Sequence, residues 1–223
     1  MNDVPRALPC LEIGAPREEA DLCVLLMHGL GADGHDFEDV GIALSEAAIP
    51  GKWRFVLPHA PELPVTINMG MQMPAWYDIL DLSQPREVDW GTVAESHAAV
   101  DALIDAEPAA QLVLAGFSQG AAMALHAGLR RQDRIAGILA MSGYLLESDE
   151  FPCPAKSADF PIGMFHGGDD PVVQLAAAEQ AKASLGEAGF SPTLKVYPGM
   201  DHSVCDEELR DVFAWLSSVA TTG

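Results

Sequence analysis

Short apolar runs alternate with longer segments of helical periodicity along most of the chain. The apolar runs are bounded by turn residues, which is typical of buried strands, and they lie at residues 22–27, 53–57, 111–115, 135–141, 161–165 and 193–197. The segments between them repeat apolar residues at spacings of three and four, which predicts helices at residues 37–48, 91–106, 119–129, 172–188 and 206–219.

This alternation of strands and helices predicts an α/β fold with a mostly parallel central sheet and helices on both of its faces. The length of 223 residues suits a single domain over residues 1–223. Ligands of such sheets bind at the carboxyl ends of the strands. Residues 58–90, rich in Pro, Met and Trp, depart from the alternation and are expected to form a long functional loop.

Composition excludes several classes of protein. A hydrophobic content of 49% favours a globular chain, and no apolar run approaches the length of a membrane-spanning helix. The net charge of −21 argues against nucleic-acid binding and against electrostatic docking on membranes. The four cysteines are far apart, so we expect free thiols and no metal site. The N-terminal segment lacks the pattern of a secretory signal, which favours a cytoplasmic location.

The strongest chemical motif is the G-x-S-x-G sequence at residues 116–120, which places Ser118 between a predicted strand and a predicted helix. This context is typical of a nucleophile elbow, in which the serine adopts a strained backbone conformation. Side chains at Gly116 or Gly120 would collide with neighbouring backbone in so sharp a turn. The alternative interpretation is a plain structural turn, which also favours Gly and Ser.

A serine nucleophile needs a base, and in hydrolases with this elbow the acid and then the histidine follow the serine along the chain. Three of the seven histidines follow Ser118. We expect His126, on the helix after the elbow, to be a packing residue, and His166 ends a predicted strand. His202 lies in a turn between the last predicted strand and the last predicted helix, which makes it the candidate base.

The candidate acid follows the fifth predicted strand. Asp170 precedes Pro171, which holds it extended, and it is favoured over the adjacent Asp169. The alternative is that either aspartate caps the following helix. Asp201 is expected to be an exposed turn residue, because sequence neighbours rarely achieve the approach that a carboxylate needs to orient a histidine.

Residues 28–34 form a Gly-rich loop after the first predicted strand and are the candidate second half of an oxyanion hole. The backbone amides of Leu30 and Gln119 are the expected donors. A phosphate-binding loop is the rival interpretation, but its glycine patterns are absent here, and a plain flexible loop is a third.

Taken together, these motifs resemble the phospholipase/carboxylesterase family of α/β hydrolases, which includes carboxylesterases and acyl-protein thioesterases. The resemblance rests on HGLGADGHDF at 28–37, PHAPELPVTINMGMQMPAWYD at 58–78, GFSQG at 116–120, HGGDDPVV at 166–173 and YPGMDHSV at 197–204. It implies the α/β-hydrolase fold and the triad Ser118, Asp170 and His202, because the family's aspartate immediately precedes a proline. Ala121 departs from the second glycine of many relatives, with no loss of chemistry expected.

The resemblance further implies hydrolysis of short to medium acyl esters or thioesters without a cofactor. The physiological alternatives are acyl-protein thioesterase and lysophospholipase activity, and homodimers occur in the family. A binding module without catalysis is the hypothesis from a different class. For the acyl group, apolar side chains at Met73, Trp76 and Leu146 are the candidate contacts, and packing of the loop onto the body is the alternative.

Overall fold

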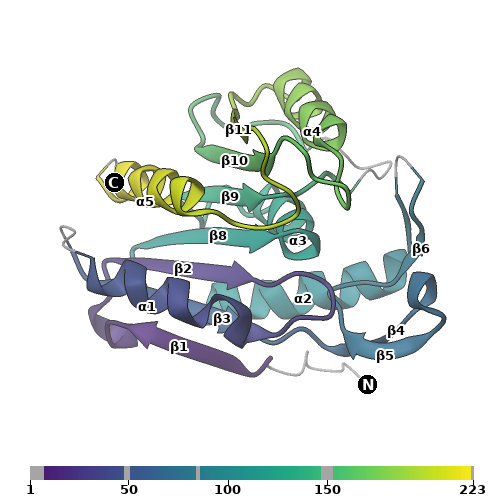
Figure 1. The fold of residues 1–223 in the computed structure, drawn as a ribbon. Helices are drawn as coiled ribbons and strands as arrows, with labels where there is room; N and C mark the ends of the chain where they lie inside the picture. Colours follow the sequence, from purple (N-terminus) through teal and green to yellow (C-terminus); the bar gives the residue numbers. More distant parts are fainter. Residues whose placement is uncertain (1–7, 48–50, 84–85, 147–152, 222–223) are drawn as a thin grey trace.

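The protein is built on a seven-stranded sheet in the order β1-β3-β2-β8-β9-β10-β11 (Figure 1). The computed structural model describes residues 8–47, 51–83, 86–146 and 153–221. The sheet strands are β1 (Cys10–Gly14), β2 (Leu22–Met27), β3 (Trp53–Pro58), β8 (Gln111–Phe117), β9 (Gly137–Met141), β10 (Ile162–Gly167) and β11 (Thr193–Tyr197). All neighbours pair in parallel except β1, which pairs antiparallel with β3, so the predicted mostly parallel sheet is confirmed.

Helices cover both faces of this sheet, as predicted. Alternate residues of β2 enter opposite apolar clusters: Leu22 and Val24 face one cluster, and Cys23 and Leu25 face the other. The first cluster is covered by α1 (Glu38–Glu46) and α5 (Asp206–Ala220), and the second by α2 (Trp90–Ala106), α3 (Gln119–Gly128) and α4 (Leu175–Glu187) (Figure 1). Burial on both faces explains why the strands are continuous apolar runs without polar alternation.

Helix α4 begins three residues later than the sequence predicts. The prediction extended it back to Val172, but the amides of Val172 and Val173 donate to the Asp170 side chain and Gln174 has extended backbone angles. A side chain that accepts both amides holds a turn there in place of the first helical turn.

The prediction of a long irregular loop over residues 58–90 is wrong. This region contains two short hairpins, one of β4 (Glu62–Val65) with β5 (Met71–Pro74) and one of β6 (Ile79–Asp81) with β7 (Glu87–Val88). A short 3-10 helix at Thr66–Asn68 also lies in this region, and two others lie earlier in the chain, at Arg17–Glu19 and Gly34–Phe37. Strand pairing satisfies backbone groups that an irregular segment would leave to solvent.

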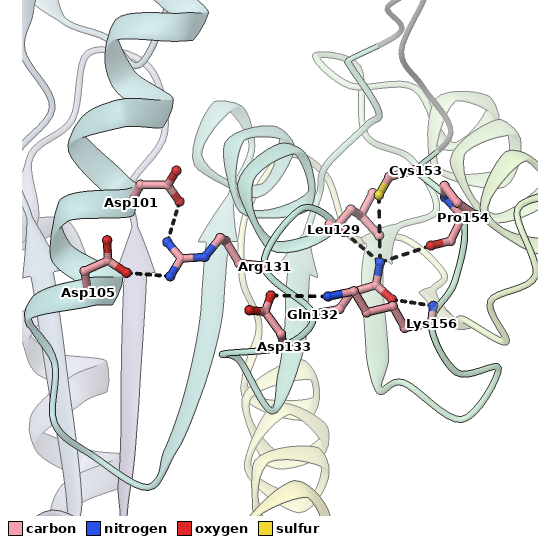
Figure 2. A network of polar contacts seen from close by, with 9 residues as sticks. All are labelled: Asp101, Asp105, Leu129, Arg131, Gln132, Asp133, Cys153, Pro154 and Lys156. Carbon is pink, nitrogen blue, oxygen red and sulfur yellow. Dashed lines mark hydrogen bonds and ion pairs between the residues drawn. The ribbon is translucent and has the colours of Figure 1, made fainter.

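Beyond the end of α3, a polar network joins three segments that are distant in the sequence (Figure 2). Arg131 donates to Asp101 at 2.9 Å and to Asp105 at 2.5 Å, both on α2. The side chain of Gln132 contacts the segment at residues 153–156, where it accepts from the Lys156 amide at 2.8 Å. The network thus connects α2 and this segment to the end of α3.

Two general findings complete the description. None of the helices in the described ranges has the length and apolar character needed to cross a membrane. All four cysteines are free thiols, in agreement with the prediction from their spacing.

Candidate active site

Ser118 lies on the turn between β8 and α3, with a backbone φ of 54° that confirms the strained elbow. The turn is possible only because its neighbours are small. A Cβ on Gly116 would lie 2.3 Å from the Gly120 backbone, and a Cβ on Gly120 would lie 2.3 Å from the Met27 carbonyl oxygen. The Ser118 amide donates to the Met141 carbonyl at 2.9 Å, which ties the elbow to β9.

The structure brings His202 to Ser118, although 84 positions separate them in the sequence. His202 Nε2 lies 2.9 Å from Ser118 Oγ, and its Nδ1 lies 2.6 Å from Asp170 Oδ2. This arrangement fits the tautomer in which Nδ1–H donates to the carboxylate and Nε2 accepts from the hydroxyl. The ring also packs against Phe117, at 4.8 Å between ring centroids.

Asp170 uses its two carboxylate oxygens for different partners. Oδ1 accepts the amides of Val172 and Val173, each at 2.8 Å, and so fixes a turn before α4. The alternative of a helix cap is wrong, because α4 begins only at Leu175 and no side chain in the described ranges caps it. Oδ2 faces His202. The Asp170 side chain is fully buried, whereas Asp169 is exposed. Only a buried carboxylate with fixed amide donors keeps one orientation toward the imidazole.

His166 contributes to this corner in a way that its sequence position did not indicate. Its Nε2 lies 2.8 Å from the Val173 carbonyl oxygen and 3.7 Å from Asp170 Oδ2. Burial lowers the pKa of His166, which keeps the ring neutral with the proton on Nε2. The side chain therefore holds the loop that carries Asp170.

His126 is a packing residue, as predicted. It is buried in α3, with its ring against those of His97 and Trp90. Burial and the nearby Arg130 lower the pKa of His126 to about 3.

The candidate oxyanion loop lies against the elbow. A Cβ on Gly29 would be 3.5 Å from Ser118 Cβ, so the backbone comes close to the serine. In the described part of the chain, neither the Leu30 amide nor the Gln119 amide donates to a protein acceptor. Both donors therefore remain available to a substrate oxygen.

Side chains behind the loop fix its position. Trp76 Nε1 donates to the His28 carbonyl at 2.9 Å, and the Ala60 amide donates to His28 Nε2 at 3.0 Å. The Gln119 side chain accepts from the Trp76 amide at 2.8 Å and donates to the Tyr77 carbonyl at 2.7 Å. One residue thus presents its amide to the site and holds the neighbouring segment with its side chain.

The predicted acyl contacts need correction at two positions. Trp76 has no exposed surface and Leu146 is 4% exposed, so neither lines an open surface. The indole is buried because its N–H finds a carbonyl partner inside the protein. Met73 is half-buried, and its sulfur accepts from Asn68 Nδ2 at 3.1 Å. Acyl contact at Met73 stays a prediction.

Among the described residues, no group of three or more His, Cys, Asp or Glu side chains could hold a metal ion. The arrangement of hydroxyl, imidazole and carboxylate can carry out acyl transfer through nucleophilic attack with general-base assistance.

Comparisons with known proteins point the same way. The sequence pattern described as Phospholipase/Carboxylesterase matches residues 8–220. Acyl-protein thioesterase 1 of Neurospora crassa is 38% identical over 231 residues, which cover 97% of this chain and 94% of that protein. The crystal structure of acyl-protein thioesterase 2 of Zea mays aligns with a TM-score of 0.82 and 25% identity, covering 95% of this chain and 99% of that one. Arabidopsis thaliana SOBER1 aligns with a TM-score of 0.81 and 29% identity, covering 89% and 98%.

Proposed function

The chain belongs to the phospholipase/carboxylesterase family of α/β hydrolases and is a serine hydrolase, and from that premise we propose that Ser118, His202 and Asp170 are its catalytic triad. The single observation that carries this proposal is the continuous contact from Ser118 Oγ through the imidazole to Asp170 Oδ2, at 2.9 Å and 2.6 Å. A serine hydroxyl becomes a nucleophile when an adjacent, oriented base accepts its proton, and these contacts supply that base.

In the first half of the reaction, Ser118 Oγ attacks the acyl carbonyl while His202 Nε2 takes its proton. Asp170 keeps the Nδ1–H directed toward itself and stabilises the imidazolium that forms. The Leu30 and Gln119 amides donate to the developing oxyanion, and the positive end of the α3 dipole supports them. His202 then protonates the leaving alcohol or thiol, which leaves an acyl-serine.

In the second half, water replaces the leaving group. His202 accepts a proton from the water, hydroxide adds to the acyl-serine carbonyl, and the same amides stabilise the second oxyanion. Collapse releases the carboxylic acid, and His202 returns the proton to Ser118 Oγ. The chain's own residues supply every proton transfer in this scheme, so it uses no cofactor.

For the substrate, we propose thioesters of acylated proteins, with lysophospholipids as the alternative. The proposal is supported by the relatives named acyl-protein thioesterase, which match most of the chain. The net charge of −21 favours substrates with neutral or cationic leaving groups over anionic ones. A cytoplasmic location and homodimer formation stay predictions. The hypothesis of a binding module without catalysis is set aside, because the family and the curated relatives make the chain an enzyme.

Turnover of p-nitrophenyl esters by Ser118→Ala tests the triad. We expect kcat to fall by roughly 10⁴- to 10⁶-fold, because the nucleophile is removed while the fold stays intact. Ser217→Ala is the matched control, since that hydroxyl only donates to the Phe213 carbonyl on α5. If Ser118→Ala keeps activity within tenfold of the wild type, the assignment of the nucleophile is wrong.

The substrate proposal needs its own measurement. The ratio kcat/KM is compared for matched esters and thioesters of increasing acyl length, for an S-acyl peptide and for a lysophospholipid. A preference for the S-acyl peptide supports the protein thioesterase role, whereas a preference for the lysophospholipid supports the alternative.

A further inference from the structure

Arg86 lies outside the triad, yet it bonds the peptide group that supports Asp170. It stands just before β7, in the hairpin that β6 and β7 form, and its Nη2 donates to the Val172 carbonyl at 2.6 Å. The amide at the other end of the same peptide group, that of Val173, donates to Asp170 Oδ1 at 2.8 Å. One peptide group therefore joins the guanidinium to the carboxylate.

The guanidinium is held in place by a buried tyrosine pair. Arg86 Cζ lies 4.7 Å from the centroid of the Tyr144 ring, which is the geometry of a cation–π contact. Tyr144 is 4% exposed, and its hydroxyl lies 2.7 Å from that of the fully buried Tyr77. Tyr77 is in turn fixed through its carbonyl, which accepts from the Gln119 side chain. Arg86 is thus anchored on the same framework that supports the oxyanion loop.

We propose that Arg86 is a positioning residue for catalysis, which acts on Asp170 through the Val172–Val173 peptide group. This inference rests on the proposed triad. A charged donor at a carbonyl oxygen polarises the peptide group and strengthens the hydrogen bond that its N–H donates. His166 holds the next carbonyl, that of Val173, at 2.8 Å. With the Val172 carbonyl bonded by Arg86, the Val173 amide stays aligned with Asp170 Oδ1, and Oδ2 stays directed at His202.

Steady-state kinetics of Arg86→Met and Arg86→Lys test this role, with active sites counted by fluorophosphonate titration. Methionine keeps an unbranched apolar stem without the donor or the charge. We expect its kcat on a short p-nitrophenyl ester to fall about tenfold, equivalent to about 1.4 kcal/mol, with KM within twofold of the wild type. Lysine retains a cationic donor, so Arg86→Lys should stay within about threefold of the wild-type kcat.

The matched control is Arg131→Ala, because Arg131 donates to Asp101 and Asp105 far from the acid loop. Its kcat should stay within twofold of the wild type. A double-mutant cycle identifies the route of the effect: in an Asp170→Asn background, Arg86→Met should change kcat by less than twofold. If Arg86→Met does not fold, Arg86→Lys takes its place in the cycle, and its smaller loss should likewise vanish.

Three results would overturn the proposal: an unchanged kcat in Arg86→Met, a loss that appears mainly in KM, or losses that multiply in the Asp170→Asn background. Failure of the triad itself is distinguishable from these results. In that case the wild type would not react with the fluorophosphonate and Ser118→Ala would keep its turnover, whereas both results stay as expected if only the role of Arg86 is wrong.

Discussion

The segments before and after helix α3 are held by different kinds of contact. At its start, Ser118 holds a φ of 54° between glycines whose Cβ positions are occupied by backbone. Beyond its end at Gly128, Arg131 and Gln132 are partly exposed and connect α2 and the segment at residues 153–156 through side-chain hydrogen bonds (Figure 2). The elbow tolerates almost no added atoms, whereas the network beyond the helix consists of separate contacts that can be lost one at a time.

The difference shows that the backbone is most tightly constrained at the elbow. The strained serine persists because buried strands and the buried helix over-determine its backbone, with all ten residues of α3 buried. The polar network at the other end is worth little per contact, because water and salt screen exposed ion pairs. We therefore expect substitutions in the elbow to have much larger effects than substitutions in the polar network beyond the helix.

The largest effect is expected for Gly120→Ala. Its new Cβ would lie 2.3 Å from the Met27 carbonyl oxygen, so β2 or α3 must move. We expect the free energy of unfolding to fall by more than about 4 kcal/mol, or no folded protein at all, as measured by chemical denaturation.

Gly186→Ala is the control for that substitution, because nothing lies within 4 Å of its Cβ position in α4. Its stability should be unchanged or up to about 1 kcal/mol higher. Equal stabilities for the two variants would show that the elbow is not sterically constrained.

An intermediate effect is expected near the end of the helix, at the buried His126. Its pKa is lowered to about 3 in the folded state, so an unfolded chain binds a proton there at higher pH than the native state does. The stability that the neutral ring contributes is present above pH 6.5 and is lost as the pH falls toward 3, which amounts to about 3 kcal/mol at pH 4.

Denaturation of His126→Gln at several pH values checks this expectation. The variant should lose less stability than the wild type between pH 7 and pH 4, because glutamine does not titrate. His35→Gln is the opposite control, because the hydrogen bond to Glu38 raises the pKa of the exposed His35. This variant should lose slightly more stability than the wild type between pH 7 and pH 4. Parallel pH curves for His126→Gln and the wild type would contradict the explanation.

The smallest effect is expected in the polar network beyond the helix. Arg131→Ala removes the ion pairs to Asp101 and Asp105, whose side chains are 35% and 67% exposed. We expect a loss of about 1 kcal/mol or less in the free energy of unfolding, with wild-type kcat. A loss that approaches that of Gly120→Ala would erase the contrast between the two ends.

The sequence predicted those features that depend on local pattern. The buried strands of the parallel sheet and the elbow at Ser118 follow from apolar runs and from turns at strand ends. His202 and Asp170 were candidates because each follows a predicted strand. The edge strand β1 was missed because Cys10–Gly14 is short and only partly buried, so it lacks the continuous apolar run of its neighbours. The hairpins within residues 58–90 were missed because the prolines there resemble a loop.

The rest depends on tertiary contacts that no local pattern encodes. Trp76 was expected at the acyl group, but its N–H is satisfied by the His28 carbonyl, which draws the ring inside. Nothing in the sequence around Arg86 indicates that its side chain reaches the Val172 carbonyl, 86 positions away. Helix capping by Asp170 was weighed against orientation of the histidine, because the sequence does not reveal that α4 begins only at Leu175, beyond the turn that Asp170 holds.

Trapping the covalent intermediate tests the central claim most directly. The enzyme is mixed with a slowly deacylated p-nitrophenyl ester, quenched in acid and digested, and the peptides are analysed by mass spectrometry. We predict one acyl group on the Ser118 hydroxyl in the wild type and none in Ser118→Ala. Acyl groups on another residue, or turnover with no acylated peptide at any quench time, would contradict the proposed mechanism.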